Sequence, residues 1–211
     1  MNKSARSHPP EGEDLCAPTP EQEEGPYYRD LLLDRADIRE GRLGTPLRLD
    51  IGVVDSDCNP LAGAVVEVWQ CDALGTYSWY AAAGDDDHDS RALLEPGTFL
   101  RGSQRLDEGG SCRFQTIYPG WYTGRAIHVH FKLRHPDGTL TGQLYFPDEL
   151  TDAIHEREPY RSRPRRDTTN EEDVIYREGG AATLLQPQTD AGRYSANVRL
   201  AIERLDHEPT H

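Results

Sequence analysis

Hydrophobic and polar positions alternate with a period of two along much of this chain. In residues 47–53, leucine, isoleucine and valine occupy every second position, with polar residues or glycine between them. Successive side chains of a β-strand point to opposite faces, so this alternation predicts a strand with one buried face. Residues 55–63 have the Asp, Asn, Pro and Gly content of a turn, and residues 64–70 are predicted to form the return strand.

Further strands and a short helix are predicted downstream. Strand-like patterns recur in residues 112–118, 126–134, 140–146 and 194–202. Residues 148–156 favour a short helix, with Pro159 just beyond its end, and residues 160–172 form an irregular connection. The pattern therefore predicts an all-β fold: an antiparallel β-sandwich with long functional loops and one or two short helices.

A single domain accounts for the length of the chain. A sequence of 211 residues can bury one substantial core and is short for two. Residues 1–20 are rich in Pro, Glu and Ser, which predicts a flexible N-terminal tail, and the β-sandwich domain is expected to span residues 21–211. The acidic segment 84–89 could hold Ca²⁺, but its spacing differs from an EF-hand loop and a solvated loop is favoured.

Charge and hydropathy exclude several partners. The net charge of −14 argues against nucleic acid and against an anionic membrane surface. No apolar run approaches the length of a membrane span, and the first ten residues lack the apolar centre of a secretory signal. The chain as it stands is expected to be soluble and cytoplasmic, while removal of an export signal from a precursor stays open.

The four cysteines are Cys16, Cys58, Cys71 and Cys112. They form no C-x-x-C pair, which argues against a structural zinc site. They are either small buried residues or disulfide partners. The strand assignment puts Cys58 and Cys112 at one end of the sandwich and Cys16 and Cys71 at the other. Two disulfides with that pairing are possible, although sequence alone does not fix the connectivity.

Two histidines lie on one face of the predicted strand 126–134. His128 and His130 share that face with Lys132 and Arg134, while the apolar residues of the strand point the other way. The simplest interpretation is an amphipathic strand with its polar face in water. The alternative uses the same geometry, because two imidazoles on one face can reach a single ion.

Two tyrosines stand in distinctive surroundings. Tyr77 ends the run Trp-Gln-Cys-Asp-Ala-Leu-Gly-Thr-Tyr, and Tyr122 follows a Pro-Gly-Trp turn three residues before Arg125. Taken singly, each is an ordinary buried aromatic or corner residue. Two phenols and two imidazoles together form an unusual donor set, because anionic oxygen suits Fe(III) whereas soft thiolate favours zinc or Cu(I). The set predicts a mononuclear non-haem ferric centre and oxygen chemistry.

Together, these motifs resemble the intradiol ring-cleaving dioxygenase family, of catechol 1,2-dioxygenase and protocatechuate 3,4-dioxygenase type. The matching stretches are residues 19–28, 60–78, 114–131 and 141–146. The order Tyr, Tyr, Arg, His-x-His, Gln along the chain is more specific than any one of its parts. The long N-terminal helical region of catechol dioxygenases is not found, so the chain is similar to a short single-domain branch, many members of which are exported.

The resemblance implies a β-sandwich that holds Fe(III) and assigns roles to particular residues. The implied metal ligands are Tyr77, Tyr122, His128 and His130. Tyr122 takes the place of the tyrosine that substrate displaces, and Arg125 and Gln143 match family residues with catalytic roles. For Gln143, an ordinary polar residue on a half-exposed strand is an equally good interpretation. Pro26, Tyr27 and again Arg125 are implied to contact substrate. Tyr145, on the same strand face as Gln143, is expected to support it.

The implied reaction is intradiol cleavage of a catechol-type aromatic diol by O2, giving a cis,cis-muconate-type diacid. The implied partners are the diol and O2, and a homo-oligomer is possible. Trp121 is bulkier than the residue common at its position and could reshape the pocket. Arg101, Arg105 and Arg163 could meet a substrate carboxylate, although a surface location is favoured for all three.

Two other functions are weighed against this one. An inactive β-sandwich binding module is disfavoured because the four-residue donor set is intact. A hydrolase that uses another metal such as zinc is disfavoured because tyrosine is a rare zinc ligand. Metal content and colour distinguish the three.

Overall fold

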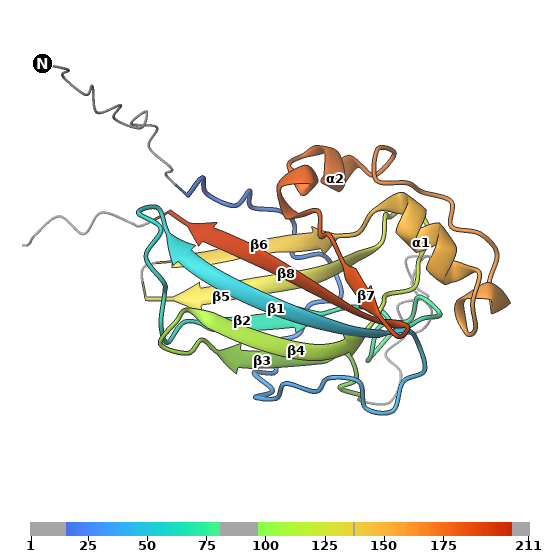
Figure 1. Cartoon of the computed structure of the whole chain (residues 1–211), viewed down its shortest axis with the longest axis horizontal. Coiled ribbons are helices and arrows are strands. Elements are labelled where there is room, and N and C mark those ends of the chain that lie inside the picture. Colours follow the sequence, from blue (N-terminus) through green and yellow to red (C-terminus); the bar gives the residue numbers. More distant parts are fainter. Residues whose placement is uncertain (1–15, 81–96, 137, 204–211) are drawn as a thin grey trace, which may run out of the picture.

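Two four-stranded sheets pack face to face in the computed structural model, which describes residues 16–80, 97–136 and 138–203 (Figure 1). The first sheet has the order β4-β1-β8-β7, formed by Ser111–Ile117, Pro46–Asp55, Arg193–Ile202 and Gln188–Asp190. The second has the order β3-β2-β5-β6, formed by Arg101–Arg105, Val65–Trp69, His128–His135 and Gly138–Tyr145. The predicted all-β sandwich is confirmed.

Among the named strands, every pair but one is antiparallel. Strand β1 pairs in parallel with β8, Leu47 lying opposite Tyr194 and Asp55 opposite Ile202. Parallel neighbours need a long crossover connection. Here the whole of the second sheet and the helical region lie between the two strands in sequence, so the crossover is available.

The core lies between the sheets and is built from the predicted alternation. On β1, Leu47, Leu49, Ile51 and Val53 are all buried. From the second sheet, Val129, Phe131 and Leu133 of β5 join the same core. These β5 residues fix the orientation of the strand. Because side chains alternate, His128 and His130 point to the opposite face of the sheet.

Short helices gather at one end of the sandwich (Figure 1). Helix α1 spans Asp148–His155, as predicted, and α2 spans Val174–Arg177. The 3₁₀ turns η1 and η2 span Tyr160–Ser162 and Gly180–Thr183. Strands β3 and β7 were not predicted, since neither shows regular hydrophobic alternation. No helix in the described parts of the chain is long and apolar enough to cross a membrane.

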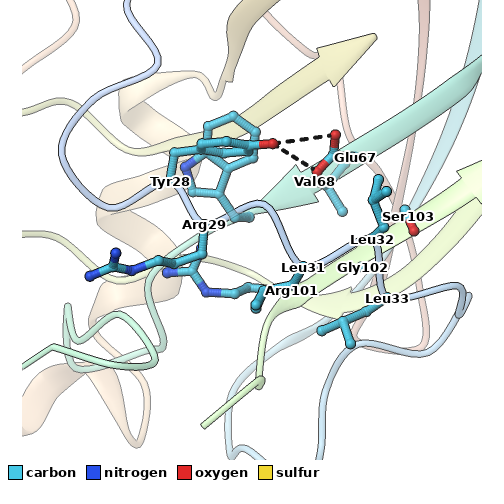
Figure 2. Close-up of a pocket in the computed structure, with 11 residues that line it drawn as sticks. Tyr28, Arg29, Leu31, Leu32, Leu33, Glu67, Val68, Arg101, Gly102 and Ser103 are labelled. Atoms are coloured by element: carbon cyan, nitrogen blue, oxygen red, sulfur yellow. Dashed lines mark hydrogen bonds between the residues drawn. The ribbon is translucent and has the colours of Figure 1, made fainter. Parts of the chain in front are cut away.

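The segment from Gln22 to Arg35 crosses the face of the second sheet that points away from the core. Gln22 N donates to Thr141 O at the β6 edge (2.9 Å), and Arg35 N donates to Ser103 O at the β3 edge (3.1 Å). Between them, Tyr28 Oη donates to Glu67 Oε2 of β2 (3.2 Å; Figure 2). This segment therefore forms a cover over the outer face of the sheet that carries the histidines.

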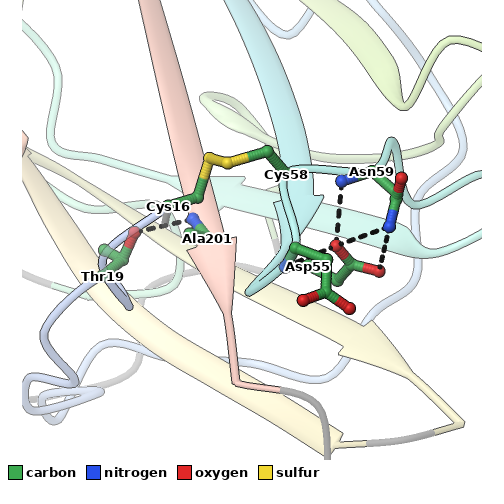
Figure 3. The surroundings of a disulfide bond; sticks show 7 residues. Cys16, Thr19, Asp55, Cys58, Asn59 and Ala201 are labelled. Carbon is green, nitrogen blue, oxygen red and sulfur yellow. Dashed lines mark hydrogen bonds between the residues drawn. A yellow bond between two sulfur atoms is a disulfide. The ribbon is translucent and has the colours of Figure 1, made fainter. Parts of the chain in front are cut away.

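A disulfide attaches the chain just before this cover segment to the sandwich. Cys16 bonds to Cys58, and next to it Thr19 exchanges hydrogen bonds with Ala201 of β8 (Figure 3). The two pairings considered possible, Cys58 with Cys112 and Cys16 with Cys71, do not form, because the Asp55–Asn59 turn brings Cys58 beside residues 16–19. Cys71 and Cys112 are free. Most of the predicted tail and the acidic segment 84–89 lie outside the described residues.

Candidate metal centre

The two histidines of β5 are buried rather than exposed. His128 and His130 are 2% and 1% exposed, so the interpretation of a water-facing polar strand does not hold for them. In the sheet register His128 lies opposite Tyr145 of β6, and His130 lies opposite Gln143 of β6 and Trp69 of β2. The alternation of β5 thus brings both imidazoles beneath the cover segment.

The imidazoles point to one small volume. Their Nε2 atoms lie 3.1 Å apart. His128 Nδ1 donates to Ala126 O (2.7 Å), and since a carbonyl can only accept, Nε2 of this ring is left with its lone pair. Burial, with the charge of Arg125, holds the pKa of both rings well below its usual value. Both are neutral, which is the form that binds a metal.

Tyr122 reaches the same volume from the turn that precedes β5. Its hydroxyl donates to His128 Nε2 (3.1 Å). Gly120 makes this possible: it donates to Asp72 O (3.0 Å), and a Cβ on it would lie 2.4 Å from Ala73 O. Only glycine lets the two loops approach so closely. The 119–122 turn is therefore packed directly on the loop that leads to Tyr77.

That second loop is held by its own aspartate. Asp72 Oδ1 accepts from Leu74 N (2.9 Å) and Thr76 N (3.0 Å), which closes the loop just before Tyr77. The Tyr77 ring lies 5.8 Å from that of Tyr122 and 6.3 Å from that of His130, centroid to centroid. All four predicted ligands are thereby brought together from three separate chain segments.

The Tyr77 hydroxyl is buried and has no hydrogen-bond partner among the residues that the structure describes. Burial, followed by the neighbouring Tyr122 phenol, holds the pKa of Tyr77 well above its usual value. Buried hydroxyls are nearly always paired, so an unpaired one beside two imidazoles and a second phenol needs an explanation, and an ion bound to its oxygen would supply one. Within the described ranges no three His, Cys, Asp or Glu side chains gather, so a cation bound to the two histidines would take its further protein ligands from the tyrosines.

Arg125 lies beside this donor set. Its Nη1 donates to Tyr122 Oη (3.3 Å), its Nη2 to Gln143 Oε1 and its Nε to Asp173 Oδ2 (3.0 Å). Tyr145 Oη also donates to Gln143 Oε1 (3.0 Å), so Tyr145 and Gln143 support the guanidinium together. The sequence predicted this trio, but it did not point to Asp173, which lies 48 residues further along.

The cover segment closes the other side. Tyr27 stacks on Tyr77 with ring centroids 4.4 Å apart and planes 13° apart, and Tyr80 Oη donates to Pro26 O (3.1 Å). Arg101 joins these pieces, because its guanidinium donates to Tyr27 O (2.7 Å) and Ser78 Oγ (2.6 Å). The expected surface location of Arg101 is therefore wrong: its side chain is buried where Tyr27 meets the loop after Tyr77.

The remaining sequence candidates lie elsewhere. Trp121 donates from Nε1 to Pro164 O (3.0 Å) and is covered by the guanidinium of Arg163, 4.2 Å from its ring. Arg105 is exposed and bonds to Gly63 O (2.6 Å). The cavity beneath the cover segment, between Tyr28 and Arg101, is about 10 Å³, room for one water at most and not for an aromatic ligand (Figure 2).

Comparisons with known proteins show the family of this chain. A family model described as Dioxygenase matches residues 22–158. Catechol 1,2-dioxygenase of Candida albicans is 35% identical over 111 residues, which cover 44% of this chain and 34% of that protein. The protocatechuate 3,4-dioxygenase beta chain of Burkholderia cepacia is 32% identical over 154 residues, which cover 67% of this chain and 62% of that protein.

A solved structure resembles the whole described fold. The intradiol ring-cleavage dioxygenase of Tetranychus urticae has a TM-score of 0.82 and 30% identity, covering 92% of this chain and 98% of that one. The fold and the family match place the protein among the dioxygenases, a class of oxidoreductases. Within that class, the chain belongs to the intradiol ring-cleavage dioxygenase family. It spans 34% and 62% of the length of the two curated relatives named above.

Proposed function

We propose that this protein is an Fe(III)-dependent enzyme that cleaves a catechol-type aromatic diol with O2 between its two hydroxyl-bearing carbons, giving a cis,cis-muconate-type diacid. The proposed ligands are Tyr77, Tyr122, His128 and His130. The observation that carries the proposal is the convergence of two neutral imidazoles and two buried phenols, one of them unpaired. Phenol oxygens with imidazoles suit a hard ferric ion better than zinc. The similarity to a catechol 1,2-dioxygenase and to an intradiol ring-cleavage dioxygenase supports the same reaction.

Ferric iron, when bound, would lower the pKa of the coordinated phenols and of a chelated diol. Tyr122 is the residue best placed to receive a substrate proton, because Arg125 Nη1 already donates to its oxygen (3.3 Å) and would stabilise that oxygen as an anion. In the described part of the chain no such donor lies beside Tyr77 Oη, which favours Tyr77 as the ligand that stays in place. The two tyrosines therefore take different roles.

Arg125 is proposed to stabilise negative charge that develops on the ring during cleavage. A guanidinium is charged at any working pH, and in this buried site its field is little screened. Gln143 accepts from Nη2 and holds the group in that orientation. Pro26 and Tyr27, on the cover segment, are proposed to line the diol pocket, where Tyr27 already stacks against Tyr77.

The test is a visible absorption spectrum of the Fe(III)-loaded protein, before and after anaerobic addition of catechol. We expect an intense phenolate-to-iron band that shifts to longer wavelength with catechol, followed by muconate formation when O2 is admitted. The His130→Ala variant should lose bound iron. Tyr118→Phe is the control and should keep its iron. Tyr118 is also buried, and its hydroxyl hydrogen-bonds to Thr151 Oγ1 (2.7 Å) rather than to any residue of the donor set.

The other outcomes contradict the proposal in distinguishable ways. A colourless protein with stoichiometric zinc would indicate a hydrolase or another zinc enzyme. A colourless protein that takes up no metal would indicate a binding module. A panel of catechol, protocatechuate, hydroxyquinol and alkylated or halogenated catechols then identifies the preferred diol by kcat/KM.

A further inference from the structure

Asp173 is a fully buried carboxylate with four N–H donors. It is 0% exposed. Its Oδ1 accepts from Ile175 N (2.8 Å) and Tyr176 N (3.4 Å), the first turn of α2, while its Oδ2 accepts from Arg125 Nε (3.0 Å) and Ala126 N (2.9 Å). Residue 173 lies beyond the 22–158 range that the family model matches.

The two oxygens have separate tasks. Oδ1 caps α2, which is only four residues long. Oδ2 does nothing for that helix and faces the Arg125–Ala126 segment instead. Burying a carboxylate is costly unless it is paired and hydrogen-bonded, and Arg125 supplies both the opposite charge and a donor. Capping alone therefore does not account for a carboxylate at this position.

The contact with Arg125 sets the direction of its guanidinium. Asp173 holds Nε, which leaves Nη1 for Tyr122 and Nη2 for Gln143. Asp173 is the only carboxylate among these three partners, and charge-assisted bonds are the stronger class. Without it, the guanidinium would keep only Tyr122 and Gln143 as partners and lose its fixed rotation about Nε.

The contact with Ala126 reaches a histidine. The Ala126 N–H is held by Asp173, and two residues later His128 Nδ1 donates to Ala126 O (2.7 Å). That second bond determines which nitrogen of His128 carries the proton. One carboxylate thus braces both the arginine and the backbone residue whose carbonyl orients the imidazole.

We propose that Asp173 is a positioning residue: it aims Arg125 at Tyr122 and fixes the orientation of His128 through Ala126. This inference rests on the proposed function, but part of its test does not. Two variants of Asp173 separate the tasks of its carboxylate. Asp173→Asn keeps the size and removes the charge. Asp173→Ser keeps a helix-capping oxygen that is too short to reach Arg125. Asp148→Asn is the control.

Asp148 is a suitable control because it is another carboxylate of this helical region that accepts from a backbone N–H and pairs with an arginine. It accepts from Asn170 N (3.2 Å) and pairs with Arg166 (2.7 Å), away from the donor set. We expect Asp173→Asn and Asp173→Ser to weaken Fe(III) binding in a chelator competition, or to lower kcat, by about 10-fold or more. Asp148→Asn should change neither by more than about twofold. Either Asp173 variant, folded by circular dichroism and unchanged in both quantities, would overturn the proposal.

A double-mutant cycle shows whether Asp173 acts through Arg125. Adding Asp173→Asn to Arg125→Gln should cost markedly less kcat than it does alone, whereas a general structural role would give additive losses and refute the inference. The metal-free protein supplies an independent readout by NMR of the His128 ring. A change in which His128 nitrogen carries the proton, seen in Asp173→Asn and absent in Asp148→Asn, supports the positioning role even where the ferric hypothesis fails. An unchanged pattern contradicts the inference that Asp173 fixes the orientation of His128.

Discussion

Trp69 lies flat against the imidazole of His130, with ring centroids 4.8 Å apart and planes 6° apart. The two residues are register partners on β2 and β5. Tyr28 of the cover segment packs on the indole as well, at 4.9 Å. Within the described ranges His130 Nδ1 has no hydrogen-bond partner, so packing orients this ring, whereas the hydrogen bond from Nδ1 to Ala126 O orients His128.

Replacing the indole should therefore release His130. Trp69→Leu is expected to weaken Fe(III) binding by about 10-fold, since groups that orient a metal ligand typically contribute that much. It should also cost about 3 kcal/mol of unfolding free energy, because a large buried aromatic is lost. Chelator competition and urea denaturation measure the two effects.

Trp121→Leu is the matched control for this change. The Trp121 indole packs under Arg163 and bonds to Pro164 O, so iron affinity should stay within about twofold of the original. Trp69→Phe should fall between the two, as it keeps a flat ring of smaller area. Equal iron affinity in Trp69→Leu and Trp121→Leu would mean that the stack does not hold His130.

The two tyrosines should respond differently to loss of their hydroxyls. Tyr122→Phe should still bind Fe(III), more weakly, and should slow the deprotonation of an added catechol, because the oxygen that receives the proton is gone. Tyr77→Phe should remove most of the phenolate absorption along with tight binding. Stopped-flow absorbance under anaerobic conditions measures both. Full turnover in Tyr122→Phe would refute its role as proton acceptor.

Much of the fold was predictable because one face of most strands is buried. Burial imposes the period of two, and β1, β4, β5, β6 and β8 were found from it. Strand β3 was missed because its sequence, Arg-Gly-Ser-Gln-Arg, is polar. Arg101 and Ser103 are nevertheless buried, in hydrogen-bonded positions rather than through apolar alternation. Strand β7 is three exposed residues held by β8 alone, and nothing in its composition indicates that.

The site residues that stand in recognisable local sequence motifs were predictable. Contacts between residues far apart in the sequence were not. The family resemblance pointed to Tyr77, Tyr122, His128 and His130. Asp173 could have been recognised as a helix cap from the residues that follow it, but its pairing with Arg125 spans 48 positions. Arg101 looked like a surface residue because sequence does not show that carbonyl and hydroxyl oxygens surround it.

The Cys16–Cys58 bond should stabilise the fold through the chain that it closes. The cysteines are 42 positions apart, a loop for which the chain-entropy model gives about 4 kcal/mol. Reduction with a thiol should therefore lower the unfolding free energy by about that amount. Cys16→Ser should show the same loss and no further response to reductant, while Cys112→Ser should respond as the unmodified protein does, because Cys112 is free. Denaturation with and without reductant gives the comparison, and a response of Cys16→Ser to reductant would contradict it.

His155 should make stability depend on pH in a defined window. Its ring stacks on Tyr160 at 5.0 Å, and Nε2 donates to Pro119 O (3.2 Å). Burial lowers the pKa of His155 from 6.5 to about 4. The unfolded chain therefore binds the proton more readily, so stability is intact above pH 6.5 and falls as the pH drops towards 4.

The size of that loss follows from the shift. The difference between a pKa of 6.5 in the unfolded chain and about 4 in the folded protein corresponds to about 3 kcal/mol, reached near pH 4. His155→Phe keeps the ring packing without a titratable group, so its unfolding free energy should lack this component. Urea denaturation of both proteins between pH 4 and pH 8 measures the difference in unfolding free energy. The titration of the carboxylates, which both proteins share, cancels in this difference. As the pH falls, the unfolding free energy of His155→Phe should rise relative to that of the unmodified protein. Curves that stay parallel across this range would mean that His155 is protonated in the folded protein as easily as in the unfolded chain.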